Sequence, residues 1–167
     1  MTSKAPTRDS KSTTTEGPIL VAVDFTDDSK AALVWAGEYA ACVGAPILVL
    51  HVVHDPAEAP GYYRKDENNL LQPIEDIAAE MMVKFLEEVA QARPDLEAMK
   101  SASSQLIKGL PATRILEIAS KIDARMIVMG SRGRTGLPHL LLGSKAERVV
   151  QLSPIPVTIV KAPNDET

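Results

Sequence analysis

The sequence between residues 126 and 144 contains Met126-Ile-Val-Met-Gly-Ser-Arg-Gly133 and, nine residues later, Gly143-Ser144. The apolar run that begins at Met126 predicts a buried strand ending at the first glycine. Ser144-x-x-Glu147 matches a capping box, which predicts that a helix starts at Ser144. Glycines let a ligand approach the backbone closely, and the N–H groups at a helix start favour an anion. The stretch therefore predicts a binding site for an oligophosphate, as in a nucleotide.

Strands and helices are expected to alternate along the rest of the chain. The expected strands are 19–23, 46–53, 99–108, 125–129 and 155–160, and the expected helices are 27–43, 73–93, 111–122 and 143–152. Because the strands are continuous apolar runs, helices should cover both faces of the sheet. Right-handed crossovers then predict an α/β fold with an open, doubly wound, five-stranded parallel sheet. Ligands of such sheets bind beyond the carboxyl ends of the strands, where Asp24 and Gly130 are expected.

The ends of the chain and one long connection are expected to lie outside the core. Residues 1–17 are polar and lack apolar periodicity, which predicts a disordered tail, and residues 163–167 form a short C-terminal tail. One domain is expected over residues 18–162. The segment 55–72 is longer than most connections, which indicates a mobile or functional loop.

The single cysteine, Cys42, is expected on the apolar face of helix 27–43, together with Val43. A small core residue is the simplest interpretation of that position. One cysteine cannot form an internal disulfide, which suits a reducing cytoplasm.

The composition of the chain and the motifs that it lacks exclude several classes of function. The chain has 18 basic and 22 acidic residues, yet residues 130–148 hold four basic residues against one acidic residue. A small basic island on an acidic protein indicates a discrete anionic ligand and argues against nucleic acid. No apolar run approaches 18 residues, so no membrane helix is expected. The P-loop, the dinucleotide fingerprint, the zinc-protease motif and the nucleophile elbow are all missing, so the sequence predicts a nucleotide holder more than a catalyst.

The glycine pattern resembles the phosphate motif of the ATP-binding branch of the universal stress protein family. That motif is Gly-x2-Gly-x9-Gly-[Ser/Thr], and Gly130, Gly133, Gly143 and Ser144 match its spacing. Five stretches around and beyond the motif are also similar, and the resemblance covers about residues 18–161. They are Val21–Asp24, Leu50–Val52, Val128–Leu137, Leu141–Val149 and Pro154–Val157.

Two positions depart from the family pattern. Ala22 stands where some ATP-binding relatives carry proline, and Phe25 stands where glycine is frequent. Neither position supplies a side-chain contact to phosphate.

The resemblance implies a Rossmann-like sheet in the order 3-2-1-4-5 and a nucleotide at the switch point between the first and fourth strands. Asp24 would accept hydrogen bonds from the ribose or nearby nucleoside groups, and Ala22 and Val52 would contact adenine through their backbones. Residues 130–136 and 143–146 would wrap the phosphates. The expected binding residues are Ala22, Val23, Asp24, Val52, Met129, Gly130, Ser131, Arg132, Gly133, Arg134, Thr135, Gly136, Gly143, Ser144, Lys145 and Ala146.

Purely structural roles for these residues also stay open. Gly130 and Gly133 fit ordinary turns, Asp24 could cap the following helix, and the loop arginines Arg132 and Arg134 could point into water. His51 lacks metal-ligand spacing with other residues, so a metal site there is not expected.

The resemblance also implies the ligands and partners. The nucleotide would be ATP, ADP or AMP, with Mg²⁺ or Mn²⁺ bound mainly through phosphates and water, and a homodimer would form through the last strand. The expected role is a cytoplasmic stress-response switch or partner-binding module, whose protein partner the sequence does not identify. Two alternatives are a slow ATPase or other nucleotide-handling enzyme, and a nucleotide-independent dimerisation module.

Overall fold

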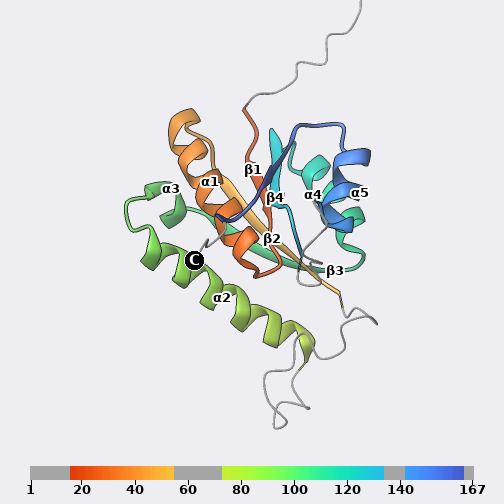
Figure 1. Cartoon of the computed structure of the whole chain (residues 1–167), viewed down its shortest axis with the longest axis horizontal. Coiled ribbons are helices and arrows are strands. Elements are labelled where there is room, and N and C mark those ends of the chain that lie inside the picture. Colours follow the sequence, from red (N-terminus) through yellow and green to blue (C-terminus); the bar gives the residue numbers. More distant parts are fainter. Residues whose placement is uncertain (1–15, 55–72, 134–141, 164–167) are drawn as a thin grey trace, which may run out of the picture.

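The computed structural model describes residues 16–54, 73–133 and 142–163, and these form one α/β unit (Figure 1). Its strands are β1 (Ile19–Ala22), β2 (Ile47–Val53), β3 (Ser103–Lys108), β4 (Met126–Gly130) and β5 (Val157–Val160). Its helices are α1 (Asp27–Val43), α2 (Ile74–Ala92), α3 (Glu97–Lys100), α4 (Pro111–Lys121) and α5 (Ser144–Leu152). All neighbouring strands are parallel and the order is β3-β2-β1-β4-β5, which confirms the expected fold.

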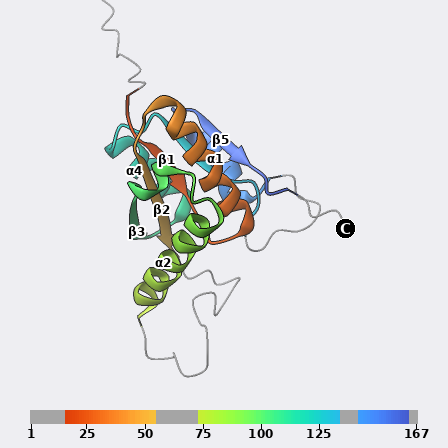
Figure 2. The same ribbon diagram turned by 90° about the vertical axis from the view of Figure 1, so that its left-hand side faces the viewer.

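Helices cover both faces of the sheet. Alternate residues of β1 enter two different cores: Ile19 and Val21 pack beneath α1 and α2, and Leu20 and Ala22 pack beneath α4 and α5. Figure 1 shows α1 and α2 together on one side and α4 with α5 on the other, and Figure 2 looks onto the side that carries α1 and α2. Because β1 is buried on both faces, its sequence is a continuous apolar run.

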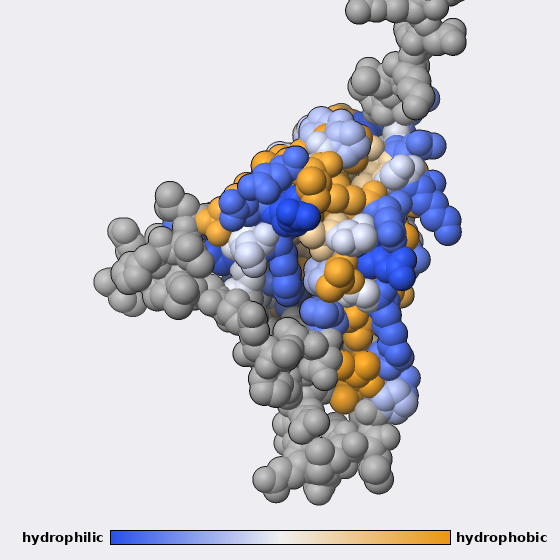
Figure 3. Space-filling view, turned by 90° about the vertical axis from the view of Figure 1, so that its right-hand side faces the viewer, coloured by the Kyte–Doolittle hydropathy of each residue, from blue (hydrophilic) through white to orange (hydrophobic). Residues whose placement is uncertain are grey.

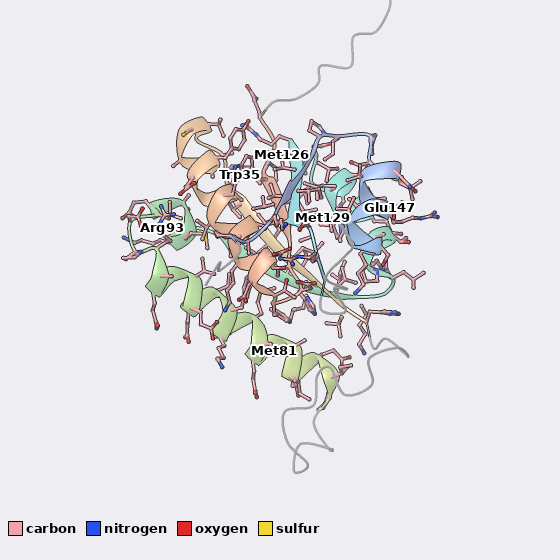
Figure 4. The ribbon with its side chains drawn as sticks, in the orientation of Figure 1. Trp35, Met81, Arg93, Met126, Met129 and Glu147 are labelled. Carbon is pink, nitrogen blue, oxygen red and sulfur yellow. The ribbon has the colours of Figure 1, made fainter. Side chains whose placement is uncertain are left out.

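Helix α1 has the bounds expected from the sequence. Thr26 is its N-cap, and the Thr26 hydroxyl accepts a hydrogen bond from the Ser29 amide at 3.3 Å. Gly44 ends the helix in the left-handed conformation, with φ of 65°. A stacked Trp35–Tyr39 pair lies on the same helix, with ring centroids 5.4 Å apart (Figure 4).

The expected burial of Cys42 is wrong. Ala36, Gly37 and Ala40 belong to the buried stripe of α1, whereas Cys42 is exposed. Each residue turns the helix by about 100°, so Cys42 lies roughly opposite Ala40. Val43, on the final turn, is also exposed.

Two expected strands are shorter in the structure by more than one residue. Met99 and Lys100 belong to the helical turn α3, so β3 begins only at Ser103. The first residues of β3 are exposed because β3 is an edge strand. The last strand starts at Val157 because the preceding residues form a turn, in which the Ser153 hydroxyl hydrogen-bonds the backbone of Ile155.

An ion-pair cluster fixes the connection that follows α2. Arg93 donates to Glu38 of α1 at 2.7 Å and to Asp95 at 2.8 Å, at the place labelled in Figure 4. Among the described residues, no helix has the length and apolar character needed to span a membrane. The loop 55–72 and nearly all of the expected N-terminal tail lie outside the described residues.

Candidate functional site

The two glycine segments, nine residues apart in sequence, lie against each other in the fold. The Gly143 amide donates to the Ser131 carbonyl at 2.7 Å. A Cβ built on Gly143 would lie 3.4 Å from both the Gly133 nitrogen and the Ser131 carbonyl oxygen, so the two segments are separated by no more than one van der Waals contact from such a carbon. Both segments sit at the carboxyl end of β4, next to β1, where Met129 pairs with Ala22. This is the point where the strand order reverses.

Helix α5 begins beside this loop, but its start differs from the expected capping box. Gly143 occupies the N-cap, with φ of −70° and ψ of 150°, and Ser144 is the first helical residue. Glycine has no side chain with which to accept a hydrogen bond from the first turn, so the amides of residues 144–146 are directed outward with the positive end of the helix dipole. Such a start is suited to a phosphate group. Lys145 adds a positive charge in the same turn.

Asp24 joins the end of β1 to the start of α1. Its Oδ1 accepts hydrogen bonds from the Thr26 hydroxyl at 2.5 Å and the Ser29 hydroxyl at 2.6 Å. The Asp24 amide donates to the same Ser29 hydroxyl at 3.0 Å. The second oxygen, Oδ2, faces the glycine loop, because a Cβ built on Gly133 would lie 3.3 Å from it. Asp24 therefore supports the start of α1 with one oxygen and borders the loop with the other.

A second carboxylate, Asp28, was not identified from the sequence as a site residue. Its side chain is only 5% exposed, and its Oδ2 accepts from the Ser131 hydroxyl at 2.8 Å, the Arg132 amide at 2.9 Å and Arg132 Nε at 3.2 Å. Its Oδ1 accepts from Arg132 Nη2 at 3.3 Å and the Ala162 amide at 3.0 Å. Burial alone would raise the pKa of Asp28, but these hydrogen bonds outweigh it and the pKa is lowered. The guanidinium expected to face a phosphate is thus bound to a buried carboxylate.

Gly130 makes that contact possible. A Cβ on Gly130 would lie 2.9 Å from both the carbonyl carbon and the Cβ of Asp28, and 3.0 Å from the Ser29 nitrogen. Most of those atoms are backbone, so a larger residue would push the start of α1 away from β4. The first glycine of the motif is required for packing.

A residue with strained backbone, Phe25, and a buried imidazole, His51, lie near Asp24. Phe25 has φ of 66°, and its ring contacts His51, with centroids 4.2 Å apart. His51 Nδ1 lies 2.7 Å from the Val23 carbonyl, to which it donates. Burial lowers the pKa of His51, and the Val23 hydrogen bond and the Asp24 charge only partly oppose this effect. The positive φ explains on physical grounds why glycine would fit at position 25.

The remaining expected binding residues divide into three groups. The side chains of Ala22, Val52 and Met129 are buried near the strand ends, and Figure 4 labels Met129. Ala146 lies on the buried face of α5. Residues 134–136, which include Arg134, Thr135 and Gly136, lie outside the described residues. Within the described ranges, no group of three His, Cys, Asp or Glu side chains could hold a metal ion.

Comparison with known proteins places this fold and motif in a family. The model of the universal stress protein family matches residues 17–161. The Bacillus subtilis stress response protein NhaX is 35% identical over 161 residues, which cover 86% of this chain and 96% of that protein.

Solved structures agree. The structure of MJ0577, a universal stress protein of Methanocaldococcus jannaschii, superposes with a TM-score of 0.64 at 25% identity, covering 90% of this chain and 99% of that one. The Archaeoglobus fulgidus universal stress protein in complex with dAMP shares the fold at 23% identity, with a TM-score of 0.57 and coverage of 87% and 98%. The chain belongs to the universal stress protein family.

Proposed function

We propose that this protein binds an adenine nucleotide at the carboxyl ends of β1 and β4. The observation that carries the proposal is the meeting of Gly133 and Gly143 at the start of α5, where the Gly143 amide binds the Ser131 carbonyl. Backbone amides and the helix dipole converge there without side chains in between, which is the chemistry that binds phosphate. The structure of the Archaeoglobus fulgidus universal stress protein in complex with dAMP supports an adenine nucleotide as the ligand.

The parts of the nucleotide are assigned by chemistry. The loop that surrounds the phosphates would consist of residues 130–136 and 143–146, with the Ser144 hydroxyl available because Ser144 does not cap the helix. The ribose would donate hydrogen bonds to Asp24, and the adenine would lie against the backbones of Ala22 and Val52. ATP, ADP and AMP all fit this scheme, and Mg²⁺ or Mn²⁺ would accompany ATP through phosphate oxygens and water.

The proposed role is a nucleotide-dependent switch or partner-binding module in the cytoplasmic stress response. We further propose a homodimer formed through β5. This strand lies at the sheet edge and all four of its residues are half-buried, so pairing with a second copy would satisfy its edge. On the side that carries α4 and α5, apolar residues lie among charged ones (Figure 3), and Val150 and Leu152 of α5 are exposed.

A substitution at Gly133 tests the location of the phosphates. Gly133→Val places a branched side chain where the loop faces Asp24, with its first carbon 3.3 Å from Oδ2. We expect calorimetric titration with Mg-ATP to show at least a tenfold loss of affinity. Circular dichroism should stay unchanged, because among the described residues that are not its direct neighbours in the chain, only Asp24 lies within 4 Å of that carbon.

The matched control is Gly44→Asn. This glycine has φ of 65° at the end of α1 and open space around it, and asparagine tolerates that conformation. We expect the control to bind Mg-ATP like the unmutated chain. Equal affinity in the Gly133→Val protein would show that the phosphates do not lie at this loop.

A further inference from the structure

Asp28 gathers three residues from two distant parts of the chain around one buried carboxylate. Ser131 and Arg132 belong to the loop after β4, and Ala162 follows β5, yet all three donate hydrogen bonds to this side chain at 2.8 to 3.3 Å. A carboxylate that is only 5% exposed is stable there because it has both an opposite charge and several donors.

These hydrogen bonds determine the shape of the glycine loop. The Arg132 amide points at Asp28, and the guanidinium of the same residue binds both oxygens of that carboxylate. The next residue, Gly133, is the one that approaches Gly143 and the start of α5. The chain therefore passes at Arg132 from the buried Asp28 carboxylate to the start of α5.

We propose that Asp28 is a positioning residue for phosphate binding, and that Arg132 acts by holding this carboxylate and does not contact the phosphates. The inference rests on the proposed nucleotide function and assigns roles within its site. Movement of Arg132 to a phosphate would leave Asp28 buried without an opposite charge, which disfavours the exchange.

The test compares Asp28→Asn with Asp27→Asn in the full chain. Both substitutions remove one negative charge from the first turn of α1, but the Asp27 side chain is 89% exposed and pairs with Lys30 at 3.7 Å. Asparagine at position 28 replaces one acceptor oxygen by an amide that repels the donors around it.

The readout is the affinity for Mg-ATP and for adenosine, each measured by calorimetry. We expect Asp28→Asn to weaken Mg-ATP binding at least tenfold and to leave adenosine binding within twofold. Asp27→Asn should change neither affinity by more than twofold. A purely structural role for Asp28 would weaken both ligands together, so equal losses for Mg-ATP and adenosine would overturn the proposal, as would a Mg-ATP affinity like that of Asp27→Asn.

A double-mutant cycle separates the two roles of Arg132, and Arg132→Gln alone keeps the test decisive if Asp28→Asn does not fold. We expect Arg132→Gln to weaken Mg-ATP binding on its own, with adenosine unaffected. Added to Asp28→Asn, it should cause no further loss beyond twofold. Losses that multiply would show that Arg132 contacts phosphate directly. With Arg132→Gln as the only folded variant, an unchanged Mg-ATP affinity would overturn the proposal.

Ligand binding by the unmutated chain distinguishes a failure of this inference from a failure of the proposed function. If it binds neither Mg-ATP nor adenosine, the proposed function fails and the positioning role falls with it. If it binds Mg-ATP and only the mutant results differ from those expected, the positioning role alone is wrong.

Discussion

Three glycines of the motif have different neighbours, and each neighbour indicates a different task. Gly130 lies against the backbone at the start of α1, Gly133 faces the Asp24 carboxylate, and Gly143 faces the backbone of the loop after β4. The first glycine therefore serves packing, whereas the other two keep the approach to the loop open. A pattern of identical residues thus contains positions with unequal consequences for folding and for binding.

The strained backbone of Phe25 is offset by the packing of its ring. A non-glycine residue at positive φ costs about 1–3 kcal/mol. The Phe25 ring contacts both His51 and Phe85, the latter with centroids 5.6 Å apart in an edge-to-face arrangement. Aromatic contacts of this kind compensate for strain, so the junction between β1 and α1 keeps its shape without glycine.

His51 should make stability depend on pH. Because burial lowers its pKa in the folded state, the unfolded chain binds more protons between that lowered value and the ordinary value of 6.5. The contribution of His51 to the free energy of unfolding is therefore complete above pH 6.5, and it is lost as the pH falls from 6.5 toward the lowered pKa. We expect urea denaturation to show a lower free energy of unfolding at pH 5.5 than at pH 7.5, by at most about 1.4 kcal/mol per pH unit from this group.

The control for this effect is His51→Gln, which cannot titrate. Other groups titrate equally in both proteins, so the difference between their pH profiles isolates His51. Parallel profiles for the two proteins would contradict a lowered pKa at this position.

At the scale of elements, the sequence predicts helices better than their ends. Thr26, the two acids of the first turn and Gly44 define α1 completely, because caps are encoded by neighbouring residues. The start of α5 is different: Ser144 matches a capping box, but Gly143 takes the cap position because its amide is held by the Ser131 carbonyl. That hydrogen bond comes from another segment, so no local pattern contains it.

The proposed homodimer can be tested at strand β5. Lysine in the middle of an exposed edge opposes pairing with another strand, because its charge would be buried at the new interface. If the dimer forms through β5, Thr158→Lys should sediment as a monomer at concentrations where the unmutated protein is a dimer. The variant should keep its circular dichroism, since Thr158 is only half-buried. An unchanged dimer would place the interface elsewhere on the molecule.

At the scale of the whole molecule, the strand order and the position of the site follow from regular rules. Alternating apolar strands and helices with right-handed connections predict the parallel sheet, and the family resemblance supplies the order that the structure confirms. The Asp28 cluster could not be predicted in this way. It joins residues 103 to 134 positions apart, and an acid in a first helical turn is ordinary in sequence.

The partner of Arg132 could not be predicted from the sequence for the same reason. A loop arginine beside glycines suggests a phosphate partner, but the carboxylate that binds it lies on another element. Its pairing depends on the close packing of α1 against β4, which Gly130 permits. Sequence patterns predict which segments meet, whereas side-chain partners depend on the completed packing.

The most direct test of the central claim is the identity of any small molecule that accompanies the freshly purified protein. The protein is denatured, and the released material is analysed by anion-exchange chromatography and mass spectrometry; any preparation that is empty is titrated with Mg-ATP. The account predicts an adenine nucleotide at about one per chain, or binding of added Mg-ATP at that ratio. Release of ATP would indicate little turnover, and release of ADP or AMP would favour slow hydrolysis. A protein that releases no nucleotide and binds no added Mg-ATP would contradict the account and favour a nucleotide-independent dimerisation module.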